Sequence, residues 1–97
     1  MVIGKLNSST KAAFGGLVAG EGNTISNEGV SISGGINGIA SGLYSSITGG
    51  YSNTASGQNA IVTGGESNVA SGEGTVVIGG QGVTDGNTTA IAPLVAP

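Results

Sequence analysis

The sequence lacks most of the side chains on which protein chemistry usually depends. None of its 97 residues is cysteine, histidine or tryptophan. Without thiols or imidazoles there is no disulfide framework, no thiol nucleophile, no histidine acid or base and no zinc site of the usual kind. No nucleophile-base pair stands out elsewhere, so we expect a non-enzymatic protein with no catalytic residue, no metal and no cofactor.

Positive charge and long apolar runs are also scarce. Lys5 and Lys11 are the basic residues, against five acidic ones, and the net charge of −3 excludes nucleic acid as an expected partner. No apolar run approaches the roughly 20 residues of a membrane-spanning helix, so we expect no membrane insertion. The opening MVIGKLNSSTK has no apolar segment of secretory type. If Met1 is the native start, we expect no signal peptide in this chain.

Glycine, by contrast, is abundant, with 21 residues of 97, and it recurs in a fixed register. With two prolines the chain is not collagen-like, and with 7% charged residues it does not have a disordered composition. Gly-Gly falls at 34–35, 49–50, 64–65 and 79–80, and Ala-Ser-Gly falls at 40–42, 55–57 and 70–72, so the chain is built from a 15-residue repeat. Weaker copies extend this register toward both ends of the chain.

When the repeats are aligned at this 15-residue period, equivalent residues form columns, and the residue types in these columns predict the fold. One column is apolar in every unit and predicts the core: Val2, Leu17, Ile32, Ile47, Val62, Val77 and Ala92. Small residues stand two places to either side, which is the alternation of a strand, and a second alternating stretch such as NTASG at 53–57 completes the unit. The sequence therefore predicts an all-β fold, a parallel β-roll of 15-residue coils with two short strands per coil. We expect about six coils over residues 1–90 and an irregular apolar tail over residues 91–97.

Other architectures fit the pattern less well. A helix is disfavoured by the glycines, which cost about 1 kcal/mol each in a helix, and hairpin stacks explain a single apolar column less simply. Calcium-binding nonapeptide rolls need an aspartate in each turn, whereas Asp85 is the one aspartate here. The glycines then predict corners with positive φ and close approach of neighbouring backbones. The shared column of Asn23, Asn53 and Asn68 predicts amides that hydrogen-bond from coil to coil.

Two outward faces follow from the alternation. One carries apolar residues beside the core column and is the expected oligomer interface: Val18, Ile61, Thr63, Val76, Ile78 and Ile91. The other is a hydroxyl-rich strip interrupted at Ile39 and Val69: Thr24, Ser26, Ser41, Thr54, Ser56, Ser71 and Thr84. That strip is either a solvated β-face or a regular array that binds ice or a glycan surface.

The aromatic residues are the candidate ligand contacts. Phe14 and Tyr44 share one corner column, and Tyr51 lies on the opposite corner. Exposed aromatic rings bury much area with little loss of rotamer entropy, although a ring that merely shields the backbone fits equally well. The glutamates also share corners, where a solvated charge that keeps neighbouring rods from associating explains them better than acid-base chemistry does.

The segment GGYSNTASGQNAIVTGGESNVASGEGTVVIGG, residues 49–80, resembles the head repeats of YadA-like trimeric autotransporter adhesins. The positions that match the repeat of that family are Asn53, Ala55, Gly57, Ile47, Gly49, Val62, Gly64, Asn68, Ala70, Gly72, Val77 and Gly79. The resemblance implies a left-handed roll, a homotrimer and binding to a host-surface protein or glycan. The stalk and anchor of a complete adhesin do not occur in this sequence.

Three functions remain open at this point. The resemblance favours a trimeric fibre or adhesin head segment on the extracellular surface of a bacterium, which attaches to a surface or acts as a rigid spacer. Related repeats in phage fibre proteins favour a virion fibre or a tail or capsid decoration protein. The hydroxyl-rich strip favours an ice-binding protein.

Overall fold

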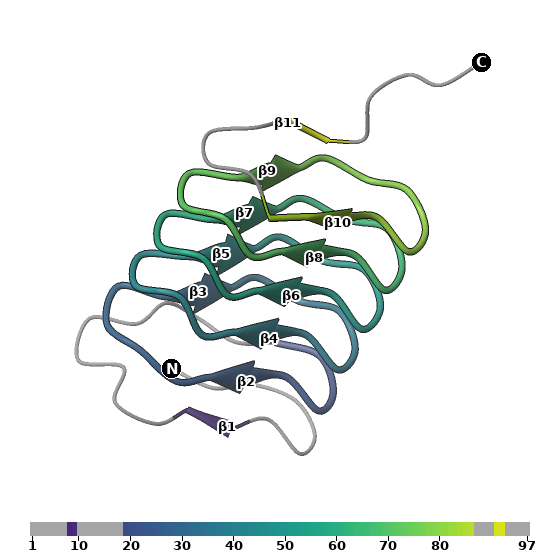
Figure 1. Cartoon of the computed structure of the whole chain (residues 1–97). Helices are drawn as coiled ribbons and strands as arrows, with labels where there is room; N and C mark the ends of the chain where they lie inside the picture. The colour runs from purple at the N-terminus through teal and green to yellow at the C-terminus, as the bar shows by residue number, and fades with distance from the viewer. Residues whose placement is uncertain (1–7, 10–18, 87–90, 93–97) are drawn as a thin grey trace.

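The chain folds as a parallel β-solenoid in which each coil contributes two strands of two residues (Figure 1). The computed structural model describes residues 8–9, 19–86 and 91–92, and within these ranges all regular structure is β-strand. The strands are β1 (Ser8–Ser9), β2 (Thr24–Ile25), β3 (Ser31–Ile32), β4 (Ile39–Ala40), β5 (Ser46–Ile47), β6 (Thr54–Ala55), β7 (Ile61–Val62), β8 (Val69–Ala70), β9 (Val76–Val77), β10 (Thr84–Asp85) and β11 (Ile91–Ala92).

Consecutive strands alternate between two sheets. The six-stranded sheet has the order β1-β2-β4-β6-β8-β10, and the five-stranded sheet has the order β11-β9-β7-β5-β3. All pairs are parallel, and the repeat places Thr54 opposite Val69 and Ile61 opposite Val76. Figure 1 shows the two sheets facing each other, with the chain crossing between them at both corners of every coil. The predicted all-β parallel roll with two strands per coil is therefore confirmed.

The register of the repeat changes near one end and continues at the other. Ser8 pairs with Thr24 in the first pair of strands, which is one position more than the repeat length, so the weak copy in that part of the chain contains one extra residue. At the other end Ile91 pairs with Val76, which keeps the regular spacing. Regular pairing therefore reaches Ala92, whereas the irregular tail was predicted to begin at residue 91. Of the predicted core column, Val2 and Leu17 lie outside the described residues.

The core is a narrow seam between the two sheets. Successive side chains of a strand point to opposite faces, and the inward one of each pair is the second residue. The five-stranded sheet contributes Ile32, Ile47, Val62 and Val77, and the six-stranded sheet contributes Ile25, Ala40, Ala55 and Ala70, all at most 1% exposed. Because the alanines of one sheet face branched residues of the other, the two sheets lie close together.

A further inward column contains an unsatisfied hydroxyl. The column consists of Val30, Ser45, Ala60 and Thr75, which are all buried. Among the described residues, Ser45 Oγ is a buried side-chain atom with no hydrogen-bond partner. A buried polar group without a partner costs about 1 to 3 kcal/mol of stability.

Replacing Ser45 with alanine is expected to stabilise the protein, because it removes this hydroxyl and leaves a side chain that the column already accepts at Ala60. We expect the free energy of unfolding to rise by about 1 kcal/mol, measured by chemical denaturation. The reciprocal variant Ala60→Ser is expected to lower it by a similar amount. A loss of stability in Ser45→Ala would contradict this explanation.

The asparagine column joins the coils through backbone groups. Asn53 Nδ2 donates to the carbonyl oxygens of Gly49 (2.9 Å) and Gly65 (3.0 Å), and Asn53 Oδ1 accepts from the backbone N–H of Asn68 (3.0 Å). Asn68 repeats this arrangement one coil further on. The prediction that the amides connect the coils was right, but they bond to the backbone rather than to one another.

Three columns of glycines differ in what the structure requires of them. Gly35, Gly50, Gly65 and Gly80 have φ between +94° and +109°, which only glycine adopts readily. Gly42 and Gly57 have no such torsion, but a Cβ there would collide with the backbone of the next coil. Gly34, Gly49, Gly64 and Gly79 meet neither condition, because a Cβ would find no atom within 4 Å. The first glycine of each Gly-Gly pair is therefore not required by the packing within one chain.

Candidate interaction surfaces

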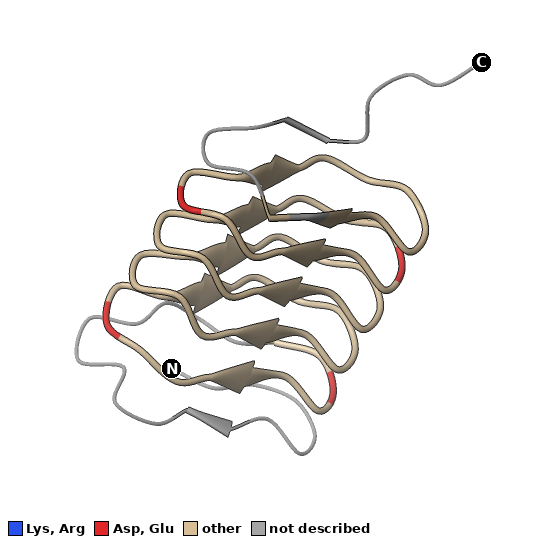
Figure 2. Cartoon of the chain, in the orientation of Figure 1, with Lys and Arg blue, Asp and Glu red and all other residues tan. Residues whose placement is uncertain are grey.

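The four glutamates lie at the corners of the coils and not in the strands. Glu21 and Glu66 lie at the corner where the chain passes from the five-stranded sheet to the six-stranded sheet. Glu28 and Glu73 lie at the opposite corner, where the chain returns (Figure 2). All four are exposed. None of the side chains described on the outward faces of the two sheets is charged. Over the described side chains the solenoid therefore presents two uncharged faces bordered by acidic corners.

The outward face of the five-stranded sheet changes character along the solenoid. Its two columns consist of Ser31, Ser46, Ile61 and Val76, and of Ser33, Thr48, Thr63 and Ile78. Ile61 is 37% exposed and Ile78 is 57% exposed, while Val76 is half-buried and Thr63 is exposed. These four predicted interface residues thus share one face, at its apolar end. Val18 lies outside the described residues, and Ile91 is described only as part of β11.

The outward face of the six-stranded sheet has a more regular pattern than the sequence analysis expected. One column consists of Thr24, Ile39, Thr54, Val69 and Thr84. The next column consists of Ser26, Ser41, Ser56 and Ser71. Ile39 and Val69 interrupt the predicted hydroxyl strip, yet every member of their column is β-branched. The coils of Thr24, Ile39, Thr54 and Val69 therefore each add one branched side chain and one serine to this face, whereas the coil of Thr84 has Gly86 in place of the serine.

We call the turn that contains Glu28, Gly29, Leu43, Tyr44, Gln58, Asn59, Glu73 and Gly74 the Tyr44 corner. Tyr44 is 57% exposed and has a φ of 59°, a left-handed conformation that is unusual for an aromatic residue. A Cβ at Gly29, one coil below, would collide with the tyrosine ring. The ring therefore covers the bare backbone of Gly29, which supports the shielding role considered for a corner tyrosine. Phe14, predicted on the same corner, lies outside the described residues.

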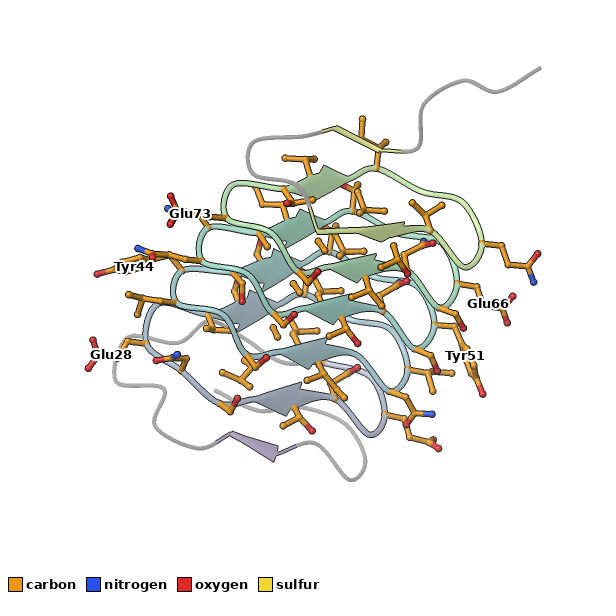
Figure 3. All side chains as sticks on the ribbon, in the orientation of Figure 1. Glu28, Tyr44, Tyr51, Glu66 and Glu73 are labelled. Carbon is orange, nitrogen blue, oxygen red and sulfur yellow. The ribbon has the colours of Figure 1, made fainter. Side chains whose placement is uncertain are left out.

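We call the opposite column of Glu21, Ile36, Tyr51, Glu66 and Gln81 the Tyr51 corner. These five residues follow one another at one per coil, and each forms a parallel bridge with the next. Tyr51 is 47% exposed and Ile36 is 41% exposed. Figure 3 shows Tyr51 and Glu66 on this corner, facing away from Tyr44. Tyr51 was predicted as a contact residue but Ile36 was not, because its described neighbours in that column are polar or aromatic and not aliphatic.

The described residues contain no group of three or more acidic, histidine or cysteine side chains that could hold a metal ion. Within the same part of the chain there is no helix long and apolar enough to cross a membrane. The two glutamates of each corner are three coils apart in the stack, since Glu21 leads to Glu66 through Ile36 and Tyr51. The chemistry available at the described surface is thus hydroxyl, amide, apolar and isolated carboxylate groups.

Comparison with known proteins gives no further guide to identity. No protein-family model, no curated protein and no solved structure matches this chain. A functional assignment therefore depends on the surfaces described above.

Proposed function

We propose that this chain is a non-enzymatic attachment module, a β-roll that associates with copies of itself and presents a regular surface to a partner. The observation that carries the proposal is the uncharged face of the five-stranded sheet with Ile61, Val76 and Ile78 at its apolar end. Contiguous exposed apolar residues on a protein surface mark an interaction site. The resemblance of residues 49–80 to adhesin head repeats supports a homotrimer as the assembled form.

The composition of the core gives a second reason for self-association. Each coil buries one isoleucine or valine in the predicted core column, and the facing side chain is alanine in three of the four coils with described partners. A branched side chain contributes about 1.5 to 3 kcal/mol when it is buried, whereas ordering each backbone residue costs about 1 to 2 kcal/mol. Burial of the five-stranded sheet against another copy would add apolar area to every coil that it covers.

Sedimentation equilibrium tests this proposal with Ile78→Glu as the variant. We expect the unmodified protein to sediment as a trimer and Ile78→Glu to associate at least a hundredfold more weakly, because burying an unpaired carboxylate costs about 3 kcal/mol or more. Ser56→Glu, which places the same charge on the six-stranded sheet, is the matched control and is expected to remain trimeric. An unmodified protein that is folded and strictly monomeric would overturn the proposal.

Two settings fit such a module, the extracellular surface of a bacterium and the virion of a phage. In both, a rigid spacer with an attachment surface needs regular geometry more than reactive groups. Mass spectrometry of purified virions and of surface fractions from cells would distinguish them.

A second candidate function is ice binding by the six-stranded sheet. The observation that favours it is the pairing of a β-branched column with a serine column over four successive coils, from Thr24 and Ser26 to Val69 and Ser71, repeated at the inter-strand spacing of about 4.8 Å. A thermal hysteresis assay decides this candidate directly. Normal growth of ice crystals in the presence of the protein would remove it.

A further inference from the structure

The Tyr51 corner combines exposed apolar and aromatic side chains in adjacent coils. Ile36 and Tyr51 are bridge partners, 41% and 47% exposed. Ile39, three positions after Ile36, is the first residue of β4 in the six-stranded sheet and is 43% exposed. These three residues are half of the large apolar side chains that are exposed in the described chain. Ile36 and Tyr51 form one patch that spans two coils, and Ile39 pairs with Thr54 at the start of the adjoining strands.

The same corner continues into hydrogen-bonding groups. Glu66 is the bridge partner of Tyr51 in the next coil, and Gln81 follows in the coil after that. Gln81 Nε2 donates a hydrogen bond of 3.0 Å to Glu66 Oε1, which holds the carboxylate in place. A carboxylate has about four acceptor positions, so this single bond leaves most of its capacity for a ligand. From Ile36 to Gln81 the corner passes from apolar to aromatic to polar over roughly 14 Å, at about 4.8 Å per coil.

We propose that the Tyr51 corner binds an uncharged oligosaccharide that lies along the solenoid axis. A sugar ring has one face of C–H groups and a rim of hydroxyl groups. The electron-rich face of the Tyr51 ring attracts the C–H groups, while Ile36, its bridge partner, extends the apolar contact. The Glu66 carboxylate and the Gln81 amide accept from and donate to the sugar hydroxyls.

Shape and charge favour this ligand over the alternatives. The corner is one residue wide and follows the axis, whereas a stable contact with a folded protein buries about 1,200 to 2,000 Å² over a broad area. All four glutamates are at the corners, and none of the residues described there is lysine or arginine, so a sialylated or sulfated glycan would approach negative charge (Figure 2). A neutral, linear sugar chain is the partner that fits both features.

The Tyr44 corner lacks this arrangement and serves as an internal comparison. The ring of Tyr44 covers Gly29, and its neighbours one coil above, Gln58 and Asn59, are amides. Among the described residues, Tyr44 is the one exposed large apolar side chain on that corner. An exposed tyrosine is thus present on both corners, but the adjoining apolar patch is present on one.

This inference rests on the proposed attachment function, and binding measurements on the whole chain test it. An array of neutral, sialylated and sulfated oligosaccharides is probed first, followed by calorimetric titration with chitotetraose, maltotetraose and lacto-N-tetraose. We expect saturable binding of at least one neutral tetrasaccharide. Tyr51→Ala is expected to weaken it at least tenfold, Tyr51→Phe to retain it within threefold, and Tyr44→Ala to leave it unchanged.

Several results would overturn the inference. They are binding of none of the three tetrasaccharides, a preference for sialylated or sulfated glycans, equal losses in Tyr51→Ala and Tyr44→Ala, or binding at the Tyr51 corner of a protein partner that has been stripped of glycans. Circular dichroism and sedimentation of Tyr51→Ala must match those of the unmodified protein. A trimer that binds no glycan would refute this inference alone, whereas a monomer that binds one would refute the proposed assembly alone.

Discussion

Replacing Gly65 with alanine is expected to cause one of the largest losses of stability that a single substitution can produce in this chain. Gly65 has a φ of +94°, and a Cβ there would collide with Asn68 Nδ2 and with the carbonyl oxygen of Gly80 in the next coil. A strained backbone torsion and an overpacked contact each cost about 1 to 3 kcal/mol. We therefore expect the free energy of unfolding to fall by about 3 kcal/mol or more, and the melting temperature by more than about 12 °C.

Its neighbour in the sequence provides the control. Gly64 has no positive φ, and a Cβ at that position would find no atom within 4 Å. Gly64→Ala is expected to be neutral or to raise the free energy of unfolding by about 0.5 kcal/mol, because alanine reduces the entropy of the unfolded chain. Thermal melts of the two variants side by side make the comparison. Equal destabilisation by both would show that the two glycines do not differ as described.

The second large effect is expected for Asn53→Ala. This substitution leaves the buried N–H of Asn68 and the carbonyl of Gly49 without the side-chain partner that they have in the native structure. Gly65 loses one of two bonds, because its carbonyl also accepts from the backbone N–H of Tyr51 at 2.9 Å. With about 1 to 3 kcal/mol for each buried group that loses its partner, we expect a loss of about 2 to 4 kcal/mol.

Chemical denaturation of Asn53→Ala measures this loss, with Gln58→Ala as its control. Gln58 is also an amide, but its side chain is exposed at the Tyr44 corner. We expect Gln58→Ala to change the free energy of unfolding by less than about 0.5 kcal/mol. If Asn53→Ala is as mild as this control, the asparagine column does not stabilise the stack of coils in the way described.

The architecture could be predicted from the sequence because a 15-residue period converts directly into stacked strands. Val62 and Val77 occupy the same column in the sequence and the same column of the core, and both are fully buried. A fixed period places each residue next to its own repeat in the neighbouring coil, so one column specifies the register of the whole stack. The longer step between Ser8 and Thr24 could not be predicted, because the first copies of the repeat resemble the later ones too weakly to reveal the extra residue.

The roles of individual corner residues were harder to predict. Tyr44, Ser52 and Asn59 adopt positive φ, although the sequence analysis assigned such torsions to glycine. Conversely, Gly64 stands in a column that is glycine in coil after coil, but it needs neither the torsion nor the space. The residue types in a column show which backbone torsions that position commonly needs. The torsion of each single residue depends on how the chain turns in its own coil.

The candidate site was predicted in part for a similar reason. Tyr51 stands out in the sequence as one of three aromatic residues. Ile36 gains significance only when the stacking of the coils places it beside Tyr51, because in the sequence it looks like an irregular member of its column. A patch that consists of exceptions to a repeat is not visible from the repeat itself.

The hydrogen bonds between coils determine how this protein would respond to tension. Bonds such as Thr54 N–H to Asn68 carbonyl (2.8 Å) and Ile61 N–H to Thr75 carbonyl (2.9 Å) join one coil to the next along the solenoid axis. A pulling force along that axis therefore loads one coil boundary after another, and the coils detach in sequence. Each detached coil releases about 50 Å of chain where it had occupied about 4.8 Å. A module held at one end and bound at the other would thus lengthen in steps and limit the force on its attachment.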